Sequence, residues 1–126
     1  MSAKLLAYLA AGGIAGTLSR YLLNSVLQPP TSTFPWATLA INVAGSFVLG
    51  FLMRFLMSSG TITPELRAGL TVGFCGAFTT MSTFSYETMS LVNAGYYGRA
   101  GVYVAASVGG SIAAAALGLA AGTKLL

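Results

Sequence analysis

Polar side chains that could bind an ion gather in one short stretch of an otherwise apolar chain. Residues 73–87 contain glycines, several hydroxyls, aromatic rings and the carboxylate of Glu87. Lipid offers a backbone no hydrogen-bond partner, so a segment this irregular must face protein or a watery cavity. A carboxylate within a membrane is a candidate functional residue, although a position near the end of a span would explain Glu87 equally well. We therefore take this stretch as the first candidate site.

Neutral hydrogen-bond donors elsewhere in the chain could complete such a site. Asn42 is the one strongly polar side chain of the second apolar segment, and Tyr103, Ser107 and Ser111 fall at i, i+4 and i+8 on one helix face. Neutral donors can replace water around a small anion without trapping it, and the electropositive edge of the Phe84 ring could add to them. A hydrogen bond between helices explains Asn42 as well as a ligand contact does, and packing alone would explain Phe84.

Composition places these residues in a membrane protein. The chain has 126 residues, 56% of them hydrophobic and only 6% charged, and its mean hydropathy is +0.80. A soluble domain is about a quarter charged, so an integral membrane protein is expected. The basic residues are scattered, which argues against nucleic-acid binding. The chain lacks histidine, a nucleophile with a base, a metal-ligand cluster and a phosphate loop, so we do not expect an enzyme.

The elements that must position the site are four helices. A span needs about 20 apolar residues, so residues 1–126 form a single transmembrane domain with spans at about 3–27, 36–57, 66–93 and 98–124. Gly12 and Gly16 predict a close helix contact in the first span. Arg20 interrupts that span and either faces the bundle interior or snorkels to the interface. The basic residues favour one end too weakly to fix an orientation, so mixed insertion is compatible with the sequence.

The third span is predicted to break near residues 76–80. Gly73 and Gly76 weaken its middle, and hydroxyls crowd beside them. A break leaves carbonyl oxygens without intrahelical partners, and such oxygens are ready ligands for a hard cation such as Na⁺. A plain kink satisfied by neighbouring helices is the alternative.

The stretch from Gly73 to Ser85, Gly-Phe-Cys-Gly-Ala-Phe-Thr-Thr-Met-Ser-Thr-Phe-Ser, resembles the signature of the Fluc (CrcB) fluoride channels. Residues 12–16 with Arg20, residues 38–42, Glu87 and the serine stripe of the fourth span agree with it. The resemblance implies a fluoride-selective passive channel that exports fluoride across the cell inner (plasma) membrane, as a multi-pass protein, and relieves fluoride toxicity.

The resemblance also implies an assembly and a set of site residues. Members of this family resemble one another as antiparallel, dual-topology homodimers with two pores and a structural sodium ion. By matching position, backbone carbonyls of Gly76 and Thr79 from both subunits would hold the sodium. The pore would use Asn42, Met81, Ser82, Thr83, Phe84, Tyr103, Ser107 and Ser111, with Glu87 near a pore end and Arg20 near the vestibule.

Met81 departs from the family pattern, which usually has phenylalanine there. Methionine fills a similar volume but offers an anion no ring edge. We expect an intact fold with altered, slower fluoride passage.

Two other functions fit the residues less well. A small multidrug transporter also has four short helices, but it places a key carboxylate in its first span, where this chain has Gly12, Gly16 and Arg20. In a non-transporting membrane subunit, the polar residues would only join helices.

Overall fold

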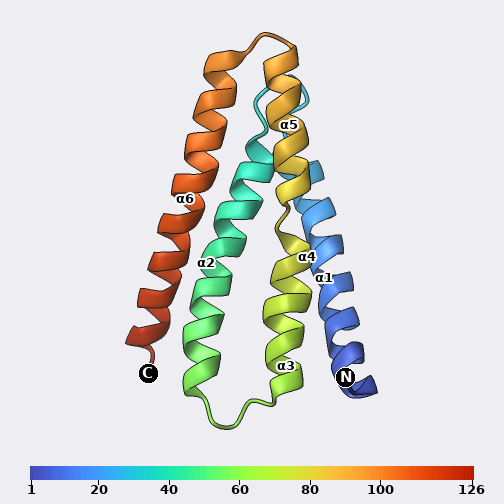
Figure 1. Ribbon diagram of the computed structural model, residues 1–126, viewed down its shortest axis with the longest axis vertical. Coiled ribbons are helices and arrows are strands. Elements are labelled where there is room, and N and C mark those ends of the chain that lie inside the picture. Colours follow the sequence, from blue (N-terminus) through green and yellow to red (C-terminus); the bar gives the residue numbers. More distant parts are fainter.

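The protein is all-α, as the sequence predicts, and its helices form an elongated bundle (Figure 1). The computed structural model describes all residues, 1–126. Both chain termini lie at the same end of the bundle (Figure 1). The elements in chain order are α1 (Ala3–Leu27), α2 (Trp36–Ser58), α3 (Pro64–Ala68), the π-helix η1 (Gly69–Cys75), α4 (Gly76–Phe78), α5 (Met81–Asn93) and α6 (Tyr97–Lys124).

Local signals set the ends of these helices. Thr63 caps α3, because its side chain accepts a hydrogen bond from the Leu66 N–H at 3.3 Å, and Pro64 follows at the first helical position. After α5 the chain turns at Gly95, whose φ of 84° is a conformation that glycine adopts without strain. α3, η1, α4 and α5 therefore follow one another in a single column between two short turns (Figure 1).

Glycines let the helix backbones touch. A Cβ atom at Gly12 would overlap the carbonyl oxygen of Gly69, and one at Gly16 would overlap that of Phe74. The predicted contact face of α1 is thus confirmed, and its partner is η1. Gly118 of α6 approaches the backbone of α2 in the same way. Close backbone packing of this kind is how helices associate where lipid removes the hydrophobic driving force between them.

Two helices, α2 and α6, are long and apolar enough to cross a membrane. They run parallel, with their first residues at the same end of the bundle (Figure 1). Only 22% of the most apolar window of α2 and 17% of that of α6 are buried inside the chain. Core helices of a soluble protein would be mostly buried, so outward-facing apolar helices favour a lipid environment. The prediction of four spans stays a prediction.

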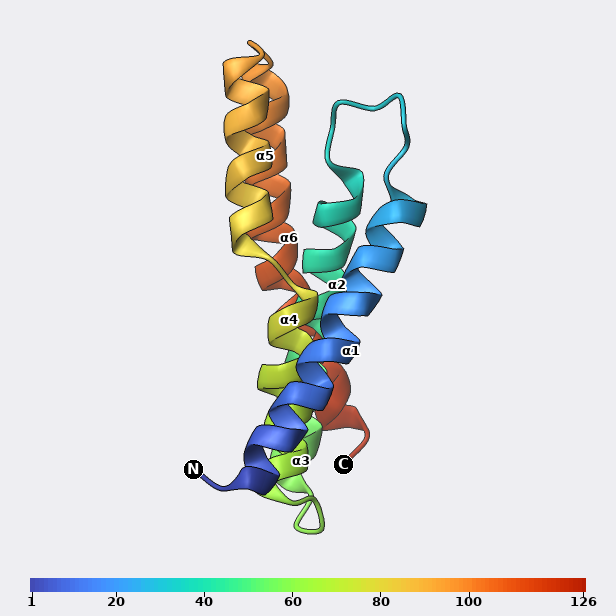
Figure 2. The same ribbon diagram turned by 90° about the vertical axis from the view of Figure 1, so that its right-hand side faces the viewer.

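The column formed by α3 to α5 leaves helical geometry at two residues. Thr79 has φ −82° and ψ 158°, and Thr80 has φ −150° and ψ 115°, so both are extended. Figure 2 shows the resulting link, from which α5 continues on a displaced axis. Gly76 keeps helical angles, so the extended residues lie at the end of the predicted 76–80 range.

Candidate functional site

Asn42 of α2 holds the extended link in place. Its Oδ1 accepts a hydrogen bond from the Thr80 N–H at 2.8 Å, and its Nδ2 donates to the Thr80 carbonyl at 3.1 Å. The amide thereby satisfies both backbone groups of Thr80, which lie within the interruption of the helix. The hydrogen bond between elements that the sequence allowed for Asn42 is present. Because an amide nitrogen carries two N–H groups, a second donor remains for another acceptor.

Thr80 also starts α5. Its Oγ1 accepts a hydrogen bond from the Thr83 N–H at 3.2 Å and donates to the Thr83 Oγ1 at 3.0 Å, which makes it the helix cap. The Ser82 hydroxyl lies 3.3 Å from the same oxygen. Ser82 and Thr83, both expected in the pore, are therefore placed in the cap of α5.

Arg20 of α1 contacts the helix interruption between α4 and α5 from the side opposite Asn42. Its Nε donates to the Ala77 carbonyl oxygen at 2.9 Å. In an unbroken helix that oxygen would accept from the amide of residue 81. The guanidinium therefore faces into the bundle, at the negative end of α4, where a cation is favoured.

A cavity of about 320 Å³ lies between α2, α5 and α6. The polar side chains Asn42, Ser107 and Ser111 line it, together with Met81 and Phe84. Ser107 is only 6% exposed, and its hydroxyl has no hydrogen-bond partner. A buried hydroxyl without a partner is unfavourable, so this oxygen favours a hydrogen-bonding ligand in the cavity.

Glu87 is anchored by two hydroxyls from other helices. Thr38 Oγ1 donates to Glu87 Oε1 at 2.7 Å, and the Tyr103 hydroxyl donates to Oε2 at 2.9 Å. Tyr103 is 0% exposed, and its ring centroid lies 5.2 Å from that of Phe84. Because Phe84 lines the cavity, the ring pair joins the carboxylate cluster to the cavity.

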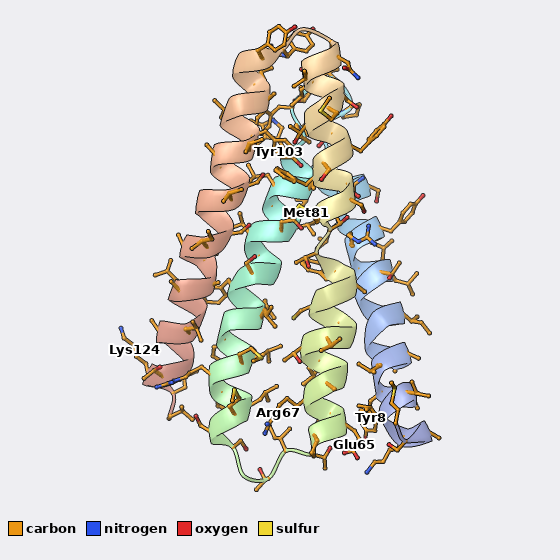
Figure 3. All side chains as sticks on the ribbon, in the orientation of Figure 1. Tyr8, Glu65, Arg67, Met81, Tyr103 and Lys124 are labelled. Carbon is orange, nitrogen blue, oxygen red and sulfur yellow. The ribbon has the colours of Figure 1, made fainter.

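Met81 stands at the start of α5, below Tyr103 in Figure 3. Its side chain is 72% exposed, although it contributes to the cavity wall. A side chain this open is not fixed by packing, so its thioether can change rotamer at little cost.

The carbonyls of Gly76 and Thr79 fit the chemistry of a hard cation. The Thr80 N–H, which would bond Gly76 in an unbroken helix, donates to Asn42, and the Thr83 N–H, which would bond Thr79, donates to Thr80 Oγ1. Both carbonyl oxygens thus lack their usual amide donors and could face Na⁺. Gly76 is exposed, with open space where a Cβ would stand.

A second, smaller cavity of about 160 Å³ lies on the α1 side of the interruption. Arg20, Thr38 and Thr80 line it. Thr80 lines the larger cavity as well, so the two cavities meet at the extended link.

The structure divides most of the predicted pore residues among three places. The large cavity is lined by Asn42, Met81, Phe84, Ser107 and Ser111. The carboxylate cluster contains Glu87 and Tyr103, and the small cavity is lined by Arg20.

Thr38 and Thr80 carry contacts of the site that residue-by-residue prediction missed. Thr38 precedes Asn42 by one helical turn, so its place on the same face could have indicated it. Thr80 acts through its backbone and as a cap, and only the path of the chain reveals those roles.

The comparison with known families settles the family. The family model described as "CrcB-like protein, Camphor Resistance (CrcB)" matches residues 7–119. The chain belongs to the CrcB family. The match includes every residue of the two cavities and of the Glu87 cluster.

Curated relatives agree with this assignment to the CrcB family. The chain is 45% identical over 103 residues to a protein of Chlorobaculum tepidum, with 82% of each chain covered. It is 46% identical over 101 residues to one of Geobacter sulfurreducens, covering 79% of this chain and 82% of the relative. A protein of Methanopyrus kandleri is 49% identical over 94 residues, covering 75% and 71% respectively. Each of these three relatives is named "Fluoride-specific ion channel FluC".

Proposed function

We propose that this protein is a fluoride-selective passive channel that exports fluoride across the cell inner membrane and so relieves its toxicity. The observation that carries the proposal is the cavity beside α5, where the buried Ser107 hydroxyl has no partner. The name shared by the relatives supports fluoride as the transported ion. Under this proposal the protein is a channel and not an enzyme.

The donors of this cavity suit a small anion that accepts hydrogen bonds. Asn42 keeps one free N–H, and Ser107 and Ser111 offer hydroxyls, while no cation lines the cavity. A neutral lining can take the place of water around the anion and still release it, which conduction requires. The Phe84 ring can present its electropositive edge to the same space.

The proposed route runs past the extended link. Thr80 lines both cavities, and Arg20 lies in the smaller one, where its charge would raise the local concentration of anions. Glu87 lies beside the route, near its end, with its charge held by Thr38 and Tyr103. In the larger cavity, conduction would then pass between neutral donors, and the only cation on the route would be Arg20 of the smaller cavity.

We further infer an antiparallel, dual-topology homodimer with two pores and a structural sodium ion at its centre. The exposed Gly76 allows a second copy to approach the interruption closely. Carbonyls of Gly76 and Thr79 from both copies would supply oxygen ligands, which suit Na⁺. The ion would contribute fixed positive charge that holds the two interrupted helices together. In this assembly α1, α2, α6 and the column from α3 to α5 are the four spans.

Electrogenic efflux from proteoliposomes tests the proposed activity. Vesicles loaded with fluoride and containing the protein should release it once a potassium ionophore removes the opposing voltage, and chloride-loaded vesicles should not leak. Proton-driven export of aromatic cations that depends on Glu87, without fluoride flux, would favour a multidrug transporter instead.

A further inference from the structure

The largest cavity of the molecule lies away from the proposed pore. Its volume is about 810 Å³, and it opens between the loop joining α1 to α2 and the first turns of α6. The loop supplies Thr31, Ser32 and Thr33, while α6 supplies Arg99 and Val102. Figure 2 shows the loop and the start of α6 at the same end of the bundle.

The guanidinium of Arg99 is held in position beside this cavity. It donates to the Thr33 hydroxyl through Nη1, and its Cζ lies 4.5 Å from the centre of the Tyr96 ring. Both side-chain carboxylates of the chain lie elsewhere. Glu65 is in the first turn of α3, and Glu87 is bonded to Thr38 and Tyr103. Arg99 is therefore a positioned cation without an acidic partner.

The loop that forms one wall of the cavity is ordered by hydrogen bonds. Gln28 donates from Nε2 to the Phe34 carbonyl at 3.0 Å and accepts from the Ala37 N–H at 3.2 Å. The Ser32 hydroxyl accepts from the Phe34 N–H at 3.2 Å. These hydrogen bonds fix the loop before any ligand arrives, which lowers the entropic cost of binding.

The cavity lies at the level where lipid headgroups are expected. The two helices that qualify as membrane spans, α2 and α6, begin at Trp36 and Tyr97, and Trp36 lines the cavity with 52% of its surface exposed. Tryptophan is enriched at the membrane interface. One turn further along α6, Val102 adds an apolar surface that is 61% exposed, which suits the start of an acyl chain.

We propose that this cavity binds the phosphate of an anionic phospholipid headgroup. Arg99 supplies the charge, the hydroxyls of the loop supply neutral donors, and Trp36 and Val102 contact the upper part of the lipid chains. The site does not depend on fluoride conduction. The Phe34 ring connects it to the pore side, because its centroid lies 5.6 Å from that of Tyr103.

The single tryptophan of the chain provides the test. Vesicles would contain either phosphatidylglycerol or phosphatidylcholine with brominated acyl chains, which quench Trp36 emission on contact. We expect stronger quenching by phosphatidylglycerol in the wild type, and this preference should weaken as salt screens the charge. Arg99→Gln should reduce the preference by about fivefold, the effect of one interfacial cation.

Arg54 provides a matched control, because its Nε also donates to a threonine hydroxyl, that of Thr123 at 3.0 Å, at the opposite end of α6. Arg54→Gln should keep the wild-type lipid preference. Equal quenching by the two lipids in the wild type would overturn the proposal without any variant. So would an unchanged preference in Arg99→Gln, or an equal loss in Arg54→Gln. Saturable quenching of Trp36 by inorganic phosphate in detergent micelles would also overturn it, since it would show a site for free phosphate.

Discussion

At the scale of single residues, two buried hydroxyls of this protein have opposite roles. Thr38 donates to Glu87 at 2.7 Å, whereas the Ser107 hydroxyl has no partner. Removing a donor from the half-buried carboxylate of Glu87 leaves that charge less compensated, while removing an unpaired buried hydroxyl relieves an unfavourable burial. Substitution of Thr38 should therefore lower stability, whereas substitution of Ser107 should affect transport without lowering stability.

Thr38→Val should lower the stability of the folded protein by about 1–3 kcal/mol, because one Glu87 oxygen loses its hydrogen bond. Ser107→Ala should leave stability unchanged or slightly higher. Thermal unfolding of both variants in the same detergent measures the difference. Equal destabilisation by the two substitutions would contradict the contrast between the two hydroxyls.

Met81 offers a second prediction at this scale. Met81→Phe places a ring edge on the cavity wall, so fluoride efflux from liposomes should become faster. Met89 is a matched control, because it lies on the same helix, is 53% exposed and lines neither cavity. Met89→Phe should leave the rate unchanged. Indistinguishable rates for Met81 and Met81→Phe would remove the argument for a ring at this position.

At the scale of elements, the interruption between α4 and α5 is stabilised from three directions. Asn42 pairs with the Thr80 backbone, Arg20 bonds the Ala77 carbonyl, and Thr80 caps α5. Several of the backbone groups freed by the break are thus satisfied by protein, as a membrane setting favours. The carbonyls of Gly76 and Thr79 are among the groups without their usual amide donors.

The helix contact that supports this arrangement can be tested at two adjacent glycines of α1. Gly12→Ala would push a methyl group into the Gly69 carbonyl, so we expect a loss of about 1–3 kcal/mol in stability. Gly13→Ala meets nothing within 4 Å and should be neutral or raise stability by up to about 1 kcal/mol through helix propensity. Unfolding of both variants in detergent measures this. Equal effects at the two positions would exclude the close contact.

The sequence predicted the helices better than the contacts between them. Hydropathy indicated the helical segments because that signal is local, and the residues at helix ends in the structure, such as Thr63 and Gly95, also act locally. The bonds of Thr38 to Glu87 and of Arg20 to Ala77 join residues 49 and 57 positions apart. No local pattern specifies such pairs, so the sequence named Arg20 and Glu87 as candidates without their partners.

At the scale of the whole molecule, the bundle has two unlike ends. Lys124, Arg67 and Glu65 lie at one end (Figure 3), whereas Arg99 and the headgroup cavity lie at the other. In the proposed antiparallel dimer, each leaflet would contain the Arg99 end of one copy, with its headgroup cavity, and the Lys124 end of the other. The proposed antiparallel dimer would then present the same two surfaces to both sides of the membrane.

The proposed sodium ion makes a prediction for the assembled protein. If carbonyls of Gly76 and Thr79 from two copies hold Na⁺, replacing sodium by a large organic cation should weaken the dimer by mass action. The temperature of thermal unfolding in detergent should then increase with sodium concentration, and it should not increase with choline concentration. Identical curves in the two salts would contradict a structural sodium ion.

The most direct test of the central claim compares two serines in one efflux experiment. Ser107 lies on the proposed fluoride route, whereas Ser58 is exposed at the end of α2 and donates to the Arg54 carbonyl at 2.9 Å. Fluoride efflux from proteoliposomes should be rapid for the wild type and for Ser58→Ala, slowed about tenfold or more in Ser107→Ala by the loss of a buried donor, and absent for chloride. No fluoride efflux from the wild type, or equal efflux of chloride, would contradict the account.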